Sequence, residues 1–234
     1  DDVLDPDMYT YLTGLLKTYK AQIATCSGWY KYDSGVEKRF ESPRNVVCLN
    51  GREALGVLHE RCYLRAYVWN KLFRREVLDG IRFSTELSFA EDYEMFCRVL
   101  EQCGRIVCGT KTKYYYMQRK SGVCNCGYDR TYQKAMMMFE DYCRIYSRRY
   151  PQYKKLFENH YLFDLMGMAA AMSRNGNYVA ADCRKIKKYV RQKLPQYLMD
   201  KKVSLHLKGS ACMISVSVRA FGAVYRLLHG VESE

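Results

Sequence analysis

The pattern of apolar residues changes near residue 125, and this change constrains the fold more than any other feature of the chain. Before it, helical spacings alternate with runs rich in β-branched and aromatic residues, as in mixed α/β proteins. After it, apolar residues recur mainly at helical spacing. The sequence therefore predicts an α/β unit at 1–125, followed by a helical and basic extension at 126–234.

In the front part, apolar spacing and turn residues predict alternating helices and strands. The expected elements are a helix at 8–20, a hairpin within 22–41, a short helix at 51–61, a strand that begins at Tyr63 and turns near Asn70, and a strand at 105–117.

In the back part, helices are expected around 135–146, at 153–173 and at 179–194, the last ended by Pro195. The tail beyond them predicts a basic amphipathic helix that suits an anionic bilayer or, equally, packs on the protein with a solvated basic face. Its expected basic stripe consists of Lys208, Ser215, Arg219, Gly222, Arg226 and His229.

The chain is strongly basic, with 38 Lys and Arg against 25 Asp and Glu and a formal net charge of +13. Such a chain favours anionic partners, namely phosphates, nucleic acid or an acidic membrane surface. A nucleic-acid-binding module is therefore one interpretation, but helix-turn-helix, zinc-finger and RNP-like signatures are missing from the sequence. We expect no nucleic acid among the partners.

The 11 cysteines follow neither a zinc-site nor a disulfide spacing, and the closest pair, Cys124 and Cys126, is an isolated C-x-C. We interpret them as mostly buried free thiols in a reducing compartment, which favours a cytoplasmic location. No stretch of about 18 residues is both apolar and free of charge, so no transmembrane helix is expected.

Two adjacent acids, Glu91 and Asp92, open a predicted helix in SFAEDYEMF. Ser88 and Glu91 fit the S-x-x-E capping box, which is the structural explanation for Glu91. Asp92 instead begins an inward-facing stripe that continues to Cys103 through apolar residues. Because a buried carboxylate without a partner is costly, Asp92 is a candidate catalytic residue.

Two weaker signals point to an anionic ligand. Asp1 and Asp2 precede a helix as an acidic pair that can hold a hard divalent cation, although terminal acids are commonly just solvated. Arg119 and Ser121 lie in a basic turn directly after the last predicted strand. Such a turn can bind phosphate oxygens, or it is an ordinary exposed turn.

Four sequence blocks follow one another in the first 125 residues: DDVLDPDMY, WNKLFRREVL, IRFSTELSFAEDYEMFCRVL and KYYYMQRKSG. Their order and approximate spacing resemble those of the bacterial family 2 glycosyltransferases, which are inverting enzymes with a GT-A fold. The resemblance implies the C-terminal half of a GT-A catalytic domain. It also implies transfer of a sugar from a nucleotide-diphosphate sugar to a glycan or lipid-linked acceptor in cell-surface polysaccharide synthesis.

The resemblance also implies a role for each candidate residue. Asp1 and Asp2 match the end of a D-x-D motif that binds Mg²⁺ or Mn²⁺ and the donor diphosphate. Asp92 matches the general base, and Glu91 matches its acidic neighbour. The other matches are Arg119 and Ser121 in the segment that closes over the diphosphate, and Trp69, Asn70 and Lys71 near the acceptor, where Trp69 can also be a core residue.

These residue types suit a single displacement with inversion. A carboxylate-bound divalent cation, helped by Arg119, neutralises the leaving diphosphate. Asp92 takes the proton of the acceptor hydroxyl as the bond to the anomeric carbon forms. Because Asp92 begins a helix, we expect its pKa to stay low, as suits a weak base that acts late in a loose, cationic transition state.

The chain departs from the family pattern at its front, where family members carry a βαβ half that holds the nucleotide base and ribose. We therefore expect little or no transferase turnover from these 234 residues alone. A lipid-linked acceptor would place the protein at the inner face of the cell membrane, in peripheral contact with anionic lipid. The alternative is a non-catalytic helical or basic interaction protein that keeps a degraded transferase half.

Overall fold

The computed structural model describes residues 2–60, 62–118 and 127–229. In this part, the chain is a mixed α/β protein with a six-stranded mixed sheet and eight α-helices, which confirms the predicted fold class at this level. The chain divides into two compact units, Asp1–Gly122 and Val123–Glu234. The functional roles expected for the two parts stay predictions.

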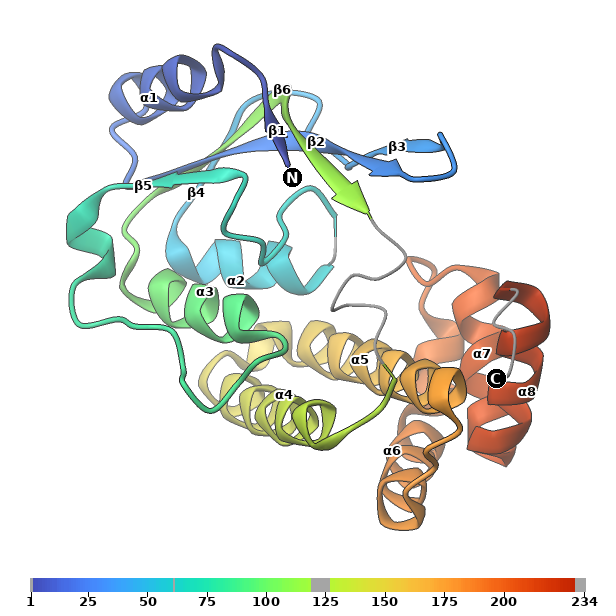
Figure 1. Ribbon diagram of the computed structural model, residues 1–234. Coiled ribbons are helices and arrows are strands. Elements are labelled where there is room, and N and C mark those ends of the chain that lie inside the picture. The colour runs from blue at the N-terminus through green and yellow to red at the C-terminus, as the bar shows by residue number, and fades with distance from the viewer. Residues whose placement is uncertain (1, 61, 119–126, 230–234) are drawn as a thin grey trace. The chain divides into compact units, whose positions relative to one another are not determined.

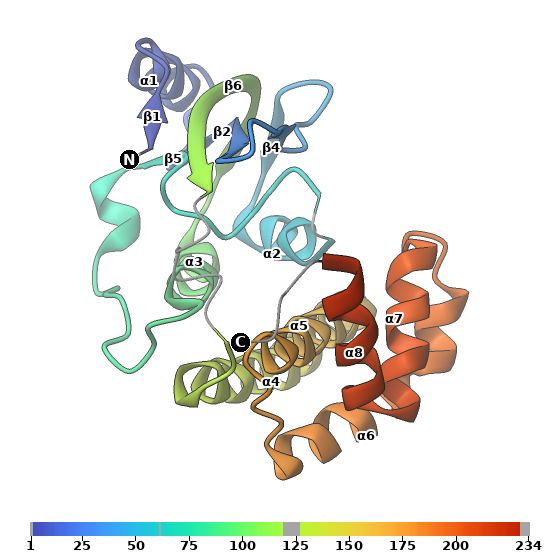
Figure 2. The same cartoon turned by 45° about the vertical axis from the view of Figure 1, so that its right-hand side comes forward.

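Two long parallel strands, β2 (Ile23–Tyr32) and β6 (Ile106–Gln118), form the centre of the sheet in the first unit. Their pairing shifts register near Ser27, and Figure 2 shows that β6 is strongly curved. Four short strands flank them, each antiparallel to its neighbour: β1 (Val3–Leu4), β3 (Glu37–Arg39), β4 (Val47–Leu49) and β5 (Lys71–Phe73).

The flanking strands divide the central pair into two halves. β4 pairs with the start of β6 and β5 with the start of β2. β1 pairs with the second half of β6, and β3 with the second half of β2. The β2–β3 pair is the hairpin that the sequence predicts within 22–41, so that prediction is confirmed.

Helices cover both faces of this sheet. Figure 1 shows α1 (Met8–Thr18) on one side, with α2 (Gly51–Glu60) and α3 (Glu91–Gln102) on the other. A 3₁₀ turn, Arg75–Leu78, follows β5. The helices predicted at 8–20 and 51–61 are confirmed. The core of the α1 side contains Met8, Leu12, Leu15, Leu16, Ala24 and Val107.

The packing of α1 on the sheet depends on Gly109. A Cβ atom at this position would lie 2.3 Å from the Tyr11 hydroxyl and 2.7 Å from a methyl group of Leu15. The Tyr11 hydroxyl accepts a hydrogen bond from the backbone N–H of Thr110 at 3.0 Å. A larger residue than glycine would therefore push α1 away from β6.

The second unit is helical, as the sequence predicts. α5 is its central helix and contacts the other four. Asp129 caps α4 by accepting from the N–H groups of Thr131 and Tyr132. The elements are α4 (Arg130–Arg149), a 3₁₀ turn (Pro151–Tyr153), α5 (Lys154–Asn175), α6 (Ala180–Met199), α7 (Leu205–Val216) and α8 (Val218–His229).

Two predicted boundaries are wrong. Pro195 lies inside α6 and does not end it, because the helix continues to Met199 and buries Tyr197 beyond the proline. The segment from Tyr63 to Trp69 is not a strand, and the strand of this region begins only at Lys71.

The expected single amphipathic tail helix is also wrong. Ser217 has an extended backbone and separates α7 from α8, which breaks the predicted stripe. Arg226 donates to the carbonyl of Ser173 at 3.1 Å and to the Tyr178 hydroxyl at 3.2 Å. A Cβ atom at Gly222 would lie 2.0 Å from that same hydroxyl. This part of the stripe therefore packs inward on the helical unit.

Two further expectations concern membranes and cysteines. Among the described residues, no helix combines the length and the hydropathy that a membrane crossing requires, as expected. The nine cysteines in this part of the chain are free thiols, of which Cys48 and Cys212 are exposed. Cys124 and Cys126 lie outside the described residues.

Candidate functional site

The start of α3 has an unusual backbone. Ala90, the residue before the helix, has a φ of 61° in the left-handed region, and no side chain caps the helix. The predicted Ser88–Glu91 capping box is therefore wrong, because Glu91 is already the first helical residue. A left-handed alanine is strained by roughly 1–3 kcal/mol, and such strain clusters at functional sites.

Asp92 occupies the first turn of this helix and is half-buried. Its Oδ1 accepts a hydrogen bond from the backbone N–H of Tyr93 at 2.7 Å. The predicted inward-facing stripe is confirmed, because Phe96 and Val99 are fully buried and Cys103 nearly so. Asp92 thus places one carboxylate at the edge of the core.

The pKa of Asp92 is raised, which contradicts the low value expected for a residue at a helix start. Burial is the largest cause, and the negative charge of Glu91 adds to it. The hydrogen bond from Tyr93 and the positive charge of Lys71 act in the opposite direction without cancelling it. Desolvation therefore outweighs the helix dipole at this position.

Lys71, at the start of β5, is only 7% exposed, and its charge acts on the Asp92 carboxylate. Its ammonium group donates to the carbonyl of Arg65 at 2.8 Å, to the carbonyl of Tyr67, and to Oδ1 of Asn70 at 2.9 Å. Burial lowers its pKa to about 7, although the nearby Asp92 carboxylate acts against this shift.

The two other residues expected near the acceptor lie just before Lys71. Asn70 is buried, and its side-chain amide donates to the carbonyl of Cys26 at 2.7 Å. Trp69 is partly exposed and stacks on Tyr67 and Tyr114, with ring centroids 4.9 Å and 4.2 Å away. Of the three predicted acceptor-side residues, Trp69 alone is exposed enough to contact a ligand, because Asn70 and Lys71 are buried.

Asp2 is attached to the second half of β6. Its Oδ2 accepts from the Tyr114 hydroxyl at 2.6 Å, and its Oδ1 accepts from the Met117 N–H at 3.0 Å. Asp1, Arg119 and Ser121 lie outside the described residues. Within the described ranges, no group of three or more His, Cys, Asp and Glu side chains could hold a metal ion.

A chain of contacts connects the described candidates within the first unit. Asp2 binds Tyr114, Tyr114 stacks on Trp69, and Trp69 precedes the buried pair Asn70 and Lys71. The charge of Lys71 in turn acts on Asp92. Asp2 lies against the second half of β6, whereas Lys71 pairs with Thr25 near the start of β2. Figure 1 shows β1, β5 and the start of α3, the elements at or next to which these residues lie.

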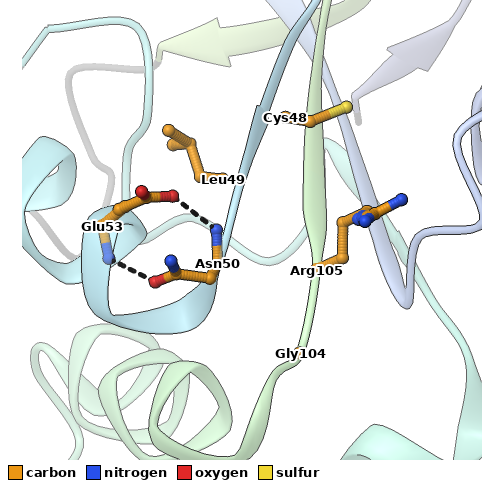
Figure 3. Close-up of a pocket in the computed structure, with 6 residues that line it drawn as sticks. All are labelled: Cys48, Leu49, Asn50, Glu53, Gly104 and Arg105. Atoms are coloured by element: carbon orange, nitrogen blue, oxygen red, sulfur yellow. Dashed lines mark hydrogen bonds between the residues drawn. The ribbon is translucent and has the colours of Figure 1, made fainter.

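A separate pocket of about 420 Å³ lies at the opposite end of α3 (Figure 3). Its lining includes Asn50 and Glu53, which form a capping box for α2, and two residues that follow α3, Gly104 and Arg105. α3 is about 18 Å long at 1.5 Å per residue, so this pocket is distant from Asp92. We assign its polar side chains to the fold.

Sequence reasoning missed the Asn50–Glu53 capping box and the burial of Lys71. The N-x-x-E pattern at residues 50–53 is the signal that could have identified the capping box. Comparison with known proteins adds no assignment, because no family model matches the chain and no curated protein matches it in sequence. The functional interpretation therefore depends on residues and geometry.

Proposed function

We propose that this chain is the C-terminal half of a GT-A catalytic domain in an inverting glycosyltransferase, followed by a helical extension. The reaction moves a sugar from a nucleotide-diphosphate sugar to a hydroxyl of a glycan or lipid-linked acceptor. The observation that carries the proposal is the half-buried Asp92 in the first turn of α3, which follows a strained Ala90 and feels the charge of the buried Lys71.

Asp92 is the general base of the proposed reaction. Burial makes its carboxylate more basic than a solvated aspartate, which improves proton transfer from a hydroxyl. The hydrogen bond from Tyr93 and the positive charge of Lys71 favour the ionised carboxylate and so oppose the effect of this burial. Glu91, in the same turn, adds negative charge and so raises the proton affinity of Asp92 further.

The donor side of the proposal uses Asp2 together with Asp1, Arg119 and Ser121. Asp2 fits as a ligand of Mg²⁺ or Mn²⁺, because each of its oxygens makes one hydrogen bond to β6 and retains acceptor capacity. The bound cation would neutralise the leaving diphosphate. Tyr114 and the Met117 N–H hold the Asp2 carboxylate in place for this role.

The acceptor side of the proposal uses the part of Trp69 that remains exposed. Its neighbours Tyr67 and Tyr114 hold the indole ring by stacking, so a sugar ring can pack on it at little cost in ordering. Asn70 and Lys71 are buried, so they are not expected to contact the acceptor themselves.

Peripheral contact with an anionic membrane at the cytoplasmic face belongs to the same proposal. Met199 and Leu205, at the turn between α6 and α7, are 82% and 85% exposed. Lys201 and Lys202 are exposed beside them. Apolar side chains flanked by lysines suit the surface of an anionic bilayer.

The decisive experiment is a turnover assay with a panel of nucleotide sugars and Mg²⁺ or Mn²⁺, applied to the chain and to any longer natural form of it. Metal-dependent binding of a nucleoside diphosphate, measured by calorimetry, is the companion measurement. Turnover that disappears with EDTA and in Asp92→Asn supports the proposal. Binding of nucleic acid without metal, and no binding of nucleoside diphosphate, would support the nucleic-acid-binding alternative.

A further inference from the structure

The segment 65–70 closes around one ammonium group. The carbonyls of Arg65 and Tyr67 and the side-chain oxygen of Asn70 all accept from Nζ of Lys71. An ammonium group has three N–H donors, whereas a neutral amine has two. The three acceptors therefore match the charged form of Lys71, and they hold the segment to which Tyr67 and Trp69 belong.

The Lys71 ammonium is close to an aromatic ring and is affected by three titratable side chains. Phe96 of α3 presents its ring 4.8 Å from Nζ, and Asp92 lies one helical turn before Phe96 on the same face. The titratable groups that act on Lys71 are Asp92 from α3, Cys26 from β2 and Cys108 from β6.

The two thiols among these groups are neutral at physiological pH. Burial raises the pKa of Cys26 to about 11 and that of Cys108 to about 12. Asp92 is therefore the anionic group among the three. The charge of Lys71 and the ionised state of Asp92 consequently depend on each other.

We infer that Lys71 is a positioning residue that fixes segment 65–70, which carries Trp69, and favours the ionised form of the Asp92 carboxylate. As a role in catalysis, this rests on the proposed transferase function. It replaces the acceptor contact expected from the sequence, because a side chain that is 7% exposed and bound to three oxygens has no free N–H for a sugar.

The first test measures the carboxyl pKa of Asp92 by carbon-13 NMR in the unmodified chain, in Lys71→Met and in Lys38→Met. Methionine has a similar length without the charge, so the pKa of Asp92 should rise in Lys71→Met. Lys38 is exposed on β3, and its replacement should leave Asp92 unchanged. An Asp92 pKa that is the same in all three proteins would overturn the inference.

A second test needs no variant at Lys71, in case Lys71→Met does not fold. In the unmodified chain, the Asp92 carboxyl carbon should show a second, smaller inflection near pH 7, where Lys71 loses its proton. A purely structural lysine that does not act on Asp92 would leave a single inflection, and this outcome would also overturn the inference.

The position of segment 65–70 is tested by fluorescence. In a Trp29→Phe background, Trp69 is the remaining tryptophan, and acrylamide should quench it more strongly in Lys71→Met than in Lys38→Met. Equal quenching would contradict the role in holding the segment. None of these readouts requires turnover, so a failed transferase assay and a failed Lys71 assignment are distinguishable.

Discussion

The hydroxyl of Tyr93 donates a hydrogen bond of 2.8 Å to Nε2 of His59, and this bond joins α2 to the first turn of α3. The other ring nitrogen, Nδ1, donates to the carbonyl of Leu55 at 2.6 Å, and burial keeps the ring neutral, so Nε2 is the acceptor for Tyr93. Because Tyr93 directly follows Asp92, the neutral His59 helps to fix the turn that carries the proposed base.

The first prediction concerns pH and His59. Burial lowers its pKa to about 4, from an ordinary value of 6.5. The unfolded chain thus binds a proton more tightly than the folded chain, and stability is lost as pH falls from 6.5 toward 4. We expect the free energy of unfolding to fall by about 3 kcal/mol over this window. Urea denaturation between pH 4 and 7 measures it.

The matched variants for this prediction are His59→Gln and His206→Gln. Glutamine carries no titratable proton, so His59→Gln should lose the contribution of this group to the pH dependence. His206 is exposed, and its replacement should keep the pH dependence of the unmodified chain. If the free energy of unfolding changed with pH in the same way in all three proteins, His59 would not be the group responsible for the loss of stability.

The second prediction concerns the contact between the start of α2 and the end of α3. A Cβ atom at Gly51 would lie 1.9 Å from the carbonyl oxygen of Leu100 and 2.6 Å from that of Cys103. Backbone atoms cannot rotate away, so Gly51→Ala should lower the free energy of unfolding by about 2–4 kcal/mol.

The control for Gly51 is Gly14→Ala. Gly14 lies within α1, and a Cβ atom there meets nothing within 4 Å. This change should raise stability by about 0.5–1 kcal/mol, because alanine favours helix. Thermal unfolding of the two variants should therefore shift in opposite directions.

The third prediction concerns the proposed base. In a form of the protein with transferase turnover, Asp92→Asn keeps the side-chain shape and removes the base, so kcat should fall by about 10²–10⁴-fold with little change in KM. Glu91→Gln removes a charge that acts only through Asp92, so its effect should be much smaller. An equal loss in the two variants would argue against a specific role for Asp92.

The fourth prediction concerns the packing of α8. Arg226→Ala leaves the Ser173 carbonyl and the Tyr178 hydroxyl without this donor, so stability should fall by about 1–3 kcal/mol. Lys201→Ala, at an exposed position of the same unit, should change it by less than about 0.5 kcal/mol. Chemical denaturation of both variants makes this comparison.

The fifth prediction concerns the turn between α6 and α7. The full chain should sediment with phosphatidylserine vesicles at low salt and much less at high salt. Replacing Lys201 and Lys202 by alanine should weaken this binding by about 30-fold, at roughly 1 kcal/mol for each lysine. No vesicle binding at low salt would remove membrane contact from the proposal.

Helices could be predicted well where apolar residues recur at helical spacing over several turns. The stripe through Asp92, Phe96 and Val99 shows this best, because each residue follows from helical spacing alone. Segment 63–69 could not be predicted, because its aromatic composition resembles that of a strand. The carbonyls of Arg65 and Tyr67 accept hydrogen bonds from the Lys71 side chain and not from the backbone N–H groups of a neighbouring strand.

The place of Asp92 at the start of a buried helical stripe was predictable, whereas the charge balance around it was not. The family resemblance implied an acceptor contact for Lys71, and its burial could not be predicted because lysine is almost never fully buried. Likewise, the effect of a helix dipole can be inferred from a sequence, because it follows from the position of a residue in a predicted helix. The desolvation that raises the pKa of Asp92 depends on tertiary packing, which the sequence does not give directly. Pro195 shows the same limit, since packing retains a helix through it.

The division of the central strand pair into two halves has a kinetic consequence. The half that carries Asp2 is flanked by β1, which has two residues, whereas β4 and β5 of the other half have three each, so the Asp2 half should open locally more often. Amide hydrogen exchange should then be fastest around Tyr114 and Met117. A donor analogue bound at Asp2 should slow amide exchange at these positions first, and this change would identify where the donor binds.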